Sequence, residues 1–270
     1  MDKLKKIAFI FLLTLFSGVF AVSAFFLGRY WLDSKQQSDK YDSLAEQVAQ
    51  IQQAVGSEDY VPEVIVTSPY TDPETNEQTV ILPEYAQLYL ENPDLVGWIN
   101  IPDTKINYPV MQTPDNPDYY LHRNFQKEGN SHGTLYIMEA CDVNTPSDNL
   151  TIYGHNMKDG SMFAGLTSFK KQSFWETHRT LTFDTLTEHH TYEIFAVFTT
   201  TASVGKGFSY HKFVSAADQD EYDEFVETCK RLSHYDTGIT PEYGDKLICL
   251  STCEYSIENG RFVVVARRIS

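Results

Sequence analysis

Cys253 and Arg261 stand where two strand-like segments meet a short turn, and their side chains suit acyl transfer. Cys253 ends the apolar run "LICLSTC", and Arg261 opens the run "RFVVV" after the turn signal "ENG". A thiolate attacks carbonyl carbon, and a guanidinium can stabilise the oxyanion that forms there. Seven residues separate the two positions, enough for a hairpin that lets the side chains meet. A buried core thiol and a surface arginine are the alternatives.

His155 is the candidate proton-transfer group. It stands in "TIYGHNMKDGSMF", where an apolar strand ends at Gly154 and a Gly- and Asp-containing loop follows. Strand ends that enter loops often carry catalytic groups. A plain polar loop residue is the alternative. His122 and His132 flank a Gly- and Asn-containing loop and stay open. The remaining histidines lie in polar turns or at helix ends and are predicted to be surface residues: His178, His189, His190, His211 and His234.

The other three cysteines have no catalytic context. Cys229 lies in a helical pattern and is predicted to be a core residue, and Cys141 is predicted to be structural at a strand end. Cys249 and Cys253 form a CxxxC pair, which makes a poor disulfide if both lie on one strand. No His/Cys cluster has zinc-site spacing, so the sequence predicts neither a disulfide scaffold nor a metal.

The elements that must position these residues are mostly strands. Runs rich in β-branched and aromatic residues, with turn residues between them, occur at 95–101, 106–112, 133–138, 150–154, 181–186, 191–202, 245–252 and 261–269. A short helix is expected from residue 83 and must stop before Pro93. The segment 215–235 has one apolar and one acidic helical face. The sequence therefore predicts a mainly β fold, a barrel or a sandwich with peripheral helices.

The N-terminal region has the pattern of a membrane anchor. Residues 7–28 carry no charge and would span about 33 Å as a helix, enough for a bilayer core. Lys3, Lys5 and Lys6 precede them, which favours a cytoplasmic N-terminus. A cleaved signal peptide is the alternative, although the apolar run is longer than usual. Residues 34–55 show a helical period, and residues 56–79 read as a linker.

The charge of the chain argues against nucleic acid as a partner. The formal net charge is −16, and the first 33 residues contain two more basic than acidic side chains, so the remainder carries −18. Such a surface repels phosphate backbones.

The combined motifs resemble a class B sortase, a cell-wall cysteine transpeptidase of Gram-positive bacteria. "LSTC", "YGHNMKDGSMF" and "VGWINIPDTKINYPVMQTPDNPDYYL" are similar to its cysteine, histidine and first-strand segments, and the helix at 215–235 is similar to the extra helix of class B. The resemblance implies an eight-stranded sortase-type β-barrel with N-terminal helices and an extra helix before the last two strands. It further implies an anchor at 1–33, a helical stalk and linker at 34–79, and a catalytic domain at 80–270.

The same resemblance assigns roles to seven residues. Cys253 would be the nucleophile, His155 the proton-transfer partner and Arg261 the oxyanion donor. The residues implied to lie near the substrate groove are Leu121, Tyr153, Ser251 and Glu254. The implied reaction cleaves a C-terminal sorting signal of the N/S-P-x-T-G/N type after Thr, and transfers the acyl group to a peptidoglycan amine. It needs no cofactor.

Three other functions remain open at this stage. A papain-like hydrolase would place its cysteine before its histidine, the opposite of this order. A pilus-polymerising sortase would use the same residues with a pilin Lys as the acceptor. A non-catalytic, membrane-tethered wall-binding module would bury Cys253.

Overall fold

The computed structural model of the chain divides into two units, residues 1–43 and 44–270. The residues that the structure describes are 3–57, 60–72, 75–203 and 205–270. Small parts of the predicted anchor and linker therefore lie outside the described residues, namely 1–2, 58–59 and 73–74.

The N-terminal helix α1 (Lys3–Val55) begins in the first unit and ends in the second. It is the one helix among the described residues that is long and apolar enough to cross a membrane, and its apolar window has a mean hydropathy of 2.4. Leu44 and Val48, on the helical stripe predicted from the sequence, are buried.

The second unit is built on a closed barrel of eight strands, which confirms the expected fold class. Around the barrel the order is β10-β8-β7-β3-β4-β5-β6-β9. The strands are β3 (Leu95–Asn100), β4 (Asn107–Met111), β5 (Leu135–Ile137), β6 (Asn149–Tyr153), β7 (Thr180–Thr185), β8 (Thr191–Thr201), β9 (Leu247–Glu254) and β10 (Gly260–Arg268). Barrel closure leaves no open strand edge among these eight, which removes a common route to aggregation.

Two strand pairs in this barrel are parallel, and one of them matters for the site. β4 pairs with β5, and β6 pairs with β9. In the second pair Tyr153 lies opposite Ser251. The carboxyl ends of β6 and β9 therefore lie side by side, and the residues that follow each strand come close together.

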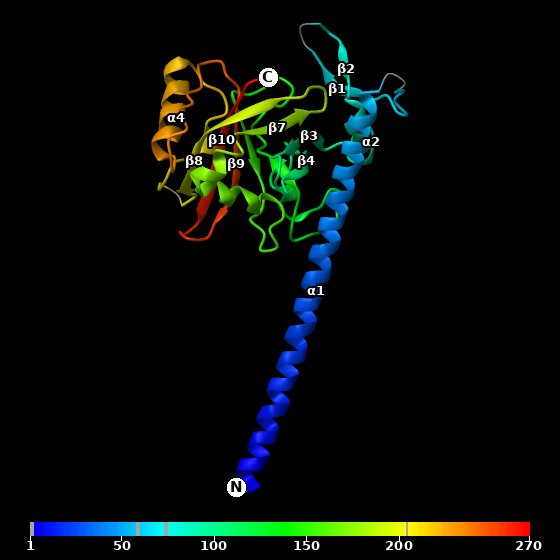
Figure 1. Ribbon diagram of the computed structural model, residues 1–270, viewed down its shortest axis with the longest axis vertical. Helices are drawn as coiled ribbons and strands as arrows, with labels where there is room; N and C mark the ends of the chain where they lie inside the picture. The colour runs from blue at the N-terminus through cyan, green and yellow to red at the C-terminus, as the bar shows by residue number, and fades with distance from the viewer. Residues whose placement is uncertain (1–2, 58–59, 73–74, 204) are drawn as a thin grey trace. The chain divides into compact units, whose positions relative to one another are not determined.

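Helices and turns cover the outside of the barrel. They are α2 (Pro83–Glu91), α3 (Gln172–Trp175), α4 (Gln219–Leu232), and the 3-10 turns η1 (Tyr119–His122), η2 (Phe163–Lys170) and η3 (Tyr210–Lys212). Figure 1 shows α4 along the flank of the barrel beside β8. The side chain of Asp218 caps α4 by accepting from the Glu221 backbone N–H at 3.0 Å.

The apolar face of α4 packs on the outer surface of the barrel. Tyr222, Phe225 and Cys229 join one core cluster with Cys249 of β9 and Val263 of β10. Alternate residues of these two strands therefore face α4, and the intervening residues face the barrel interior. This alternation decides which side chains of β9 can reach the same surface as Cys253.

The predicted linker contains a hairpin that its composition did not indicate. β1 (Thr67–Thr71) pairs antiparallel with β2 (Gln78–Val80). Pro69 and the acidic and polar residues of this stretch indicated a linker, yet proline is tolerated in a two-stranded edge where its missing N–H faces outward.

Candidate active site

Cys253 and Arg261 lie directly opposite each other in the β9–β10 hairpin. Their Cα atoms are register partners in the antiparallel pair, so both side chains project from the same face with Cβ atoms about 5 Å apart. Arg261 is also the register partner of Thr200 in β8, and its Nη1 donates to the Gly260 carbonyl at 3.0 Å. The Arg261 side chain therefore starts beside that of Cys253, and its guanidinium is held near the backbone at the start of β10.

Cys253 is the most accessible of the four cysteines. It is half-buried, whereas Cys141, Cys229 and Cys249 are buried. Burial raises the pKa of Cys141 to about 11 and also raises the pKa values of Cys229 and Cys249. These three stay protonated thiols at neutral pH, which leaves Cys253 as the candidate nucleophile among the four.

The position of His155 follows from the parallel β6–β9 pair. Gly154 follows β6, and its backbone N–H donates to the Ser251 carbonyl at 3.1 Å. A Cβ on Gly154 would come within 2.4 Å of Leu135 and 2.7 Å of Phe163, so only glycine fits. The half-buried His155 comes next, at the end of β9 that carries Cys253.

The ring of His155 is held by one backbone carbonyl. Its Nε2 donates to the carbonyl of Leu121 at 2.7 Å, because a carbonyl oxygen only accepts. This bond leaves Nδ1 as the nitrogen that can exchange a proton. Burial lowers the pKa of His155, the Leu121 bond opposes that shift, and His122 and His132 add to it. The His122 ring stacks on the His155 ring with centroids 5.7 Å apart.

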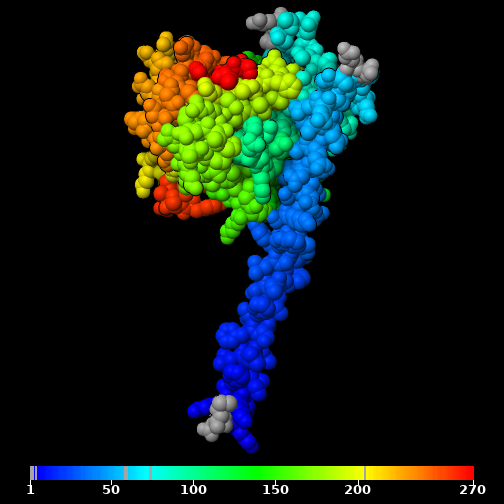
Figure 2. Space-filling model, viewed as in Figure 1, coloured from blue at the N-terminus to red at the C-terminus, as the bar shows by residue number. Residues whose placement is uncertain are grey.

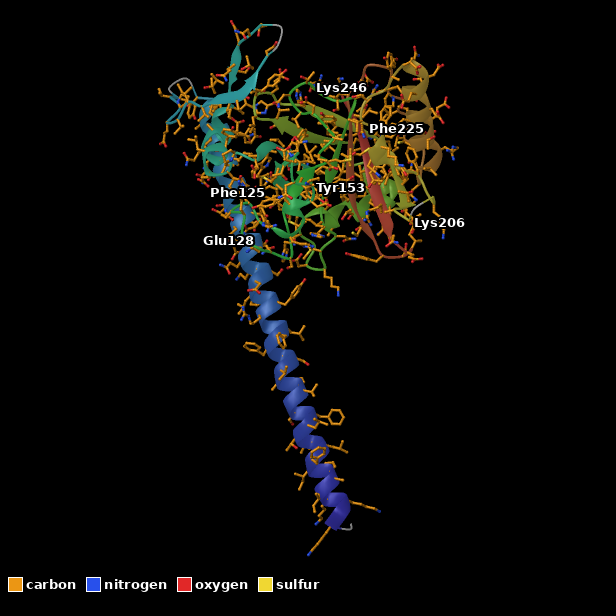
Figure 3. All side chains as sticks on the ribbon, turned by 180° about the vertical axis from the view of Figure 1, so that it is seen from behind. Phe125, Glu128, Tyr153, Lys206, Phe225 and Lys246 are labelled. Carbon is orange, nitrogen blue, oxygen red and sulfur yellow. The ribbon has the colours of Figure 1, made fainter. Side chains whose placement is uncertain are left out.

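A groove of about 540 Å³ lies beside Arg261, and neither Cys253 nor His155 is among its lining residues. Leu121, Tyr153 and Arg261, all predicted site residues, are among its lining residues. The segment after β8 forms the facing wall; Figure 3 marks Tyr153 on the barrel and Lys206 on that segment.

Ser251 lies beneath the wall of this groove and is buried. Its hydroxyl hydrogen-bonds the hydroxyl of Tyr210 at 2.6 Å, and Tyr210 lines the groove. The structure therefore brings Ser251 to the site as a support for Tyr210.

The structure does not bring Glu254 to the groove. It lies next to Cys253 on β9, so its side chain points to the opposite face of the sheet. There it forms an ion pair with Lys170 and accepts from the Ser256 backbone N–H at 2.9 Å. Desolvation alone would raise the pKa of Glu254, but the Lys170 and Ser256 hydrogen bonds outweigh it and lower that pKa. Glu254 thus fixes the start of the β9–β10 turn.

Two of the histidines predicted to be surface residues are placed differently. His190 is only 8% exposed, and burial lowers its pKa. His211 lines the groove, although "GFSYHK" alone suggested a solvated position. Tyr210 and His211 were missed because the fold of the segment after β8, which carries them to the groove, depends on tertiary contacts.

The comparisons with known proteins agree with this geometry. The family model of the sortase domain matches residues 99–269. The chain belongs to the sortase family. It is 34% identical to sortase B of Listeria monocytogenes over 203 residues, covering 73% of this chain and 78% of that protein.

Solved structures extend the similarity to most of the chain. The chain is similar to a Staphylococcus aureus sortase B–substrate complex, with a TM-score of 0.73 and 26% identity over 88% of this chain and 99% of that one. A sortase B structure complexed with triglycine gives a TM-score of 0.72 with 26% identity and the same coverage. The predicted resemblance to class B sortases is therefore confirmed, and sortases are cysteine transpeptidases.

Proposed function

We propose that this chain is a membrane-anchored class B sortase that cleaves a sorting signal after Thr and transfers the acyl group to a cell-wall amine. The observation that carries the proposal is the arrangement of a half-buried Cys253 directly across from Arg261, with His155 at the end of the neighbouring parallel strand. The three side chains come from segments up to about a hundred residues apart in the sequence, and acyl transfer uses all three.

The first half-reaction forms a thioester. The Cys253 thiol gives its proton to Nδ1 of His155, the resulting thiolate attacks the carbonyl carbon of the scissile peptide bond, and Arg261 donates hydrogen bonds to the oxyanion. As the carbon–nitrogen bond breaks, protonated His155 gives its Nδ1 proton to the leaving amine. The lowered pKa of His155 makes its imidazolium a stronger acid for this step.

The second half-reaction transfers the acyl group. The acceptor amine attacks the thioester carbon, His155 takes the amine proton on Nδ1, and the leaving Cys253 thiolate recovers a proton from His155. Every group returns to its starting state, so the reaction needs no cofactor. Among the described residues, no group of three or more His, Cys, Asp or Glu side chains is arranged to hold a metal ion.

The remaining assignments are part of the same proposal. Residues 1–33 are the anchor, residues 34–79 the stalk and linker, and residues 80–270 the catalytic domain. Leu121 and Tyr153 line the substrate groove and Ser251 supports it. The anchor crosses the membrane once and leaves the catalytic domain outside. Protease added to intact protoplasts should then degrade the domain, whereas protection of the domain or its release into the medium would contradict the anchor.

A peptide assay tests the proposed activity. The full chain in detergent micelles is incubated with N-P-x-T-G and L-P-x-T-G peptides, together with triglycine or a peptide that offers a Lys ε-amine. We expect cleavage after Thr, a product that carries triglycine, and preference for the N-P-x-T-G peptide. Transfer to the Lys amine alone would indicate a pilus-polymerising enzyme. Equal or faster turnover of L-P-x-T-G would contradict the class B specificity, and absence of any cleavage would contradict the activity.

A further inference from the structure

The backbone pairing of β6 with β9 ends at Tyr153 and Ser251, but side-chain hydrogen bonds continue it toward the active site. The Thr252 hydroxyl donates to the Gly154 carbonyl at 2.7 Å. One step further, the Asn156 side-chain amide donates to the carbonyl of Cys253 at 2.8 Å. His155 therefore stands between two residues that are each bonded to the cysteine strand.

Tyr255, which directly follows the cysteine strand, adds a second hydrogen bond to Asn156. Its hydroxyl donates to the Asn156 carbonyl at 3.1 Å, although its side chain is 74% exposed. Asn156 thus contacts the end of β9 through its side chain, at Cys253, and the turn after β9 through its backbone, at Tyr255. Because the Tyr255 ring is mostly exposed, its packing stabilises the fold little. The hydrogen bond from its hydroxyl to Asn156 is therefore the specific contact of this side chain. Figure 2 shows the turn after β9, in orange-red, and the loop after β6, in green, at the same end of the domain.

The other side of the His155 loop is attached to different parts of the barrel. The Phe163 N–H donates to the His155 carbonyl at 2.9 Å, and the Leu121 carbonyl holds the ring. These bonds fix His155 relative to η1 and η2, not relative to Cys253. The distance between the imidazole and the thiol therefore depends on the bonds from Gly154 and Asn156 to β9.

We propose that Asn156 and Tyr255 are positioning residues that set the separation between the His155 ring and the Cys253 thiol. The proposal rests on the proposed function, since it assigns the pair a role in the same site. Neither residue exchanges a proton or attacks the substrate; each acts through His155 and Cys253. A displacement of about 1 Å between reacting groups can cost about 10²-fold in rate.

Kinetics of two variants of the full chain in detergent micelles test this role. Asn156→Ala should lower kcat by about 10- to 100-fold and leave KM within about twofold, because substrate contacts are kept. Tyr255→Phe removes only the hydroxyl and should lower kcat by about 3- to 10-fold. Asn144→Ala and Tyr243→Phe are the matched controls, because both side chains are exposed and lie outside the site; they should keep the original kcat.

A second measurement does not depend on catalysis. The rate at which a methanethiosulfonate reagent labels Cys253 is recorded against pH for the wild type, His155→Ala and the two variants. If the pair positions His155, the pH profiles of Asn156→Ala and Tyr255→Phe shift toward the His155→Ala profile. A chain that cleaves no peptide but shows this shift contradicts the proposed function and supports the positioning role.

Two results overturn the positioning role. One is an unchanged labelling profile in both variants, whatever happens to kcat. The other is a rise in KM with kcat unchanged, which would place these residues in substrate binding. If Asn156→Ala does not fold, Tyr255→Phe decides alone, because its exposed ring stays in place.

Discussion

Substitution of Gly154 by alanine should lower both the stability of the fold and kcat/KM. The size of both losses follows from the contacts that one added carbon would make. The new Cβ would lie 2.4 Å from a Leu135 methyl and 2.7 Å from the Phe163 ring. Both neighbours are fully buried, so neither side chain can turn away into solvent. The end of β6 must move outward, and His155 moves with it.

The expected cost has two parts. Overpacking in a filled core destabilises by about 1–3 kcal/mol, which lowers the Tm of a domain of this size by about 2–12 °C. Displacement of His155 by about 1 Å should lower kcat/KM by about 10²-fold. Both are measured on purified full-length protein, by thermal unfolding and by peptide cleavage at a temperature well below the Tm of the variant.

Gly129→Ala is the matched control. A Cβ there would meet nothing within 4 Å, and the φ angle of Gly129 lies outside the left-handed region. We expect it to change the Tm by no more than about 2 °C and to leave kcat/KM unchanged. If Gly154→Ala matches this control in both assays, the argument that the packed strand end positions His155 is wrong.

Three further predictions concern the charges of the site. His122→Gln should raise the pKa of His155, followed by NMR of its ring, because the electrostatic interaction with His122 that lowers this pKa is removed; a fall in the pKa of His155 would contradict this effect of the His122 ring. Lys170→Met should lower the Tm near pH 7 but much less at low pH. Since the folded-state pKa of Glu254 is lowered, its ionisation stabilises the fold above its unfolded-state pKa and is lost as the pH falls through the folded-state pKa; a pH-independent Tm difference would contradict the ion pair. Arg261→Ala should lower kcat/KM by about 10²-fold or more, and Arg261→Lys should also be poor because an ammonium lacks the planar fork; near-normal kcat/KM in either variant would remove Arg261 from the site.

The strands could be predicted from the sequence because their signals are local. Runs such as "RFVVVARRI" carry β-branched residues between turn signals, and the β9–β10 hairpin joins neighbours in sequence. The meeting of Cys253 and Arg261 could therefore be expected from spacing alone. Local patterns could not show the parallel β6–β9 pair, because its partners lie about a hundred residues apart, and they left a barrel and a sandwich both open; the closed barrel was implied by the family resemblance. The proximity of His155 to Cys253 was implied by the family resemblance.

The placement of Glu254 could have been predicted from the sequence, because it directly follows Cys253 on one strand. Once Cys253 shares a face of the sheet with Arg261, the two-residue alternation of a strand sends Glu254 to the other face. His190 illustrates the opposite case. Its polar neighbours indicated a surface turn, but the turn is tight and the side chain folds against the barrel, 8% exposed. Only the tertiary structure could show this.

The most direct test of the central claim is the mass of the enzyme after reaction with a sorting-signal peptide. We expect a thioester adduct on the full chain, located by proteolysis to the fragment that contains Cys253. The adduct should disappear with hydroxylamine or an acceptor amine, be absent in Cys253→Ala, and persist in Cys141→Ala and Cys229→Ala. Peptide cleavage by Cys253→Ala, or an adduct on another residue, would contradict the assignment of Cys253 as the nucleophile.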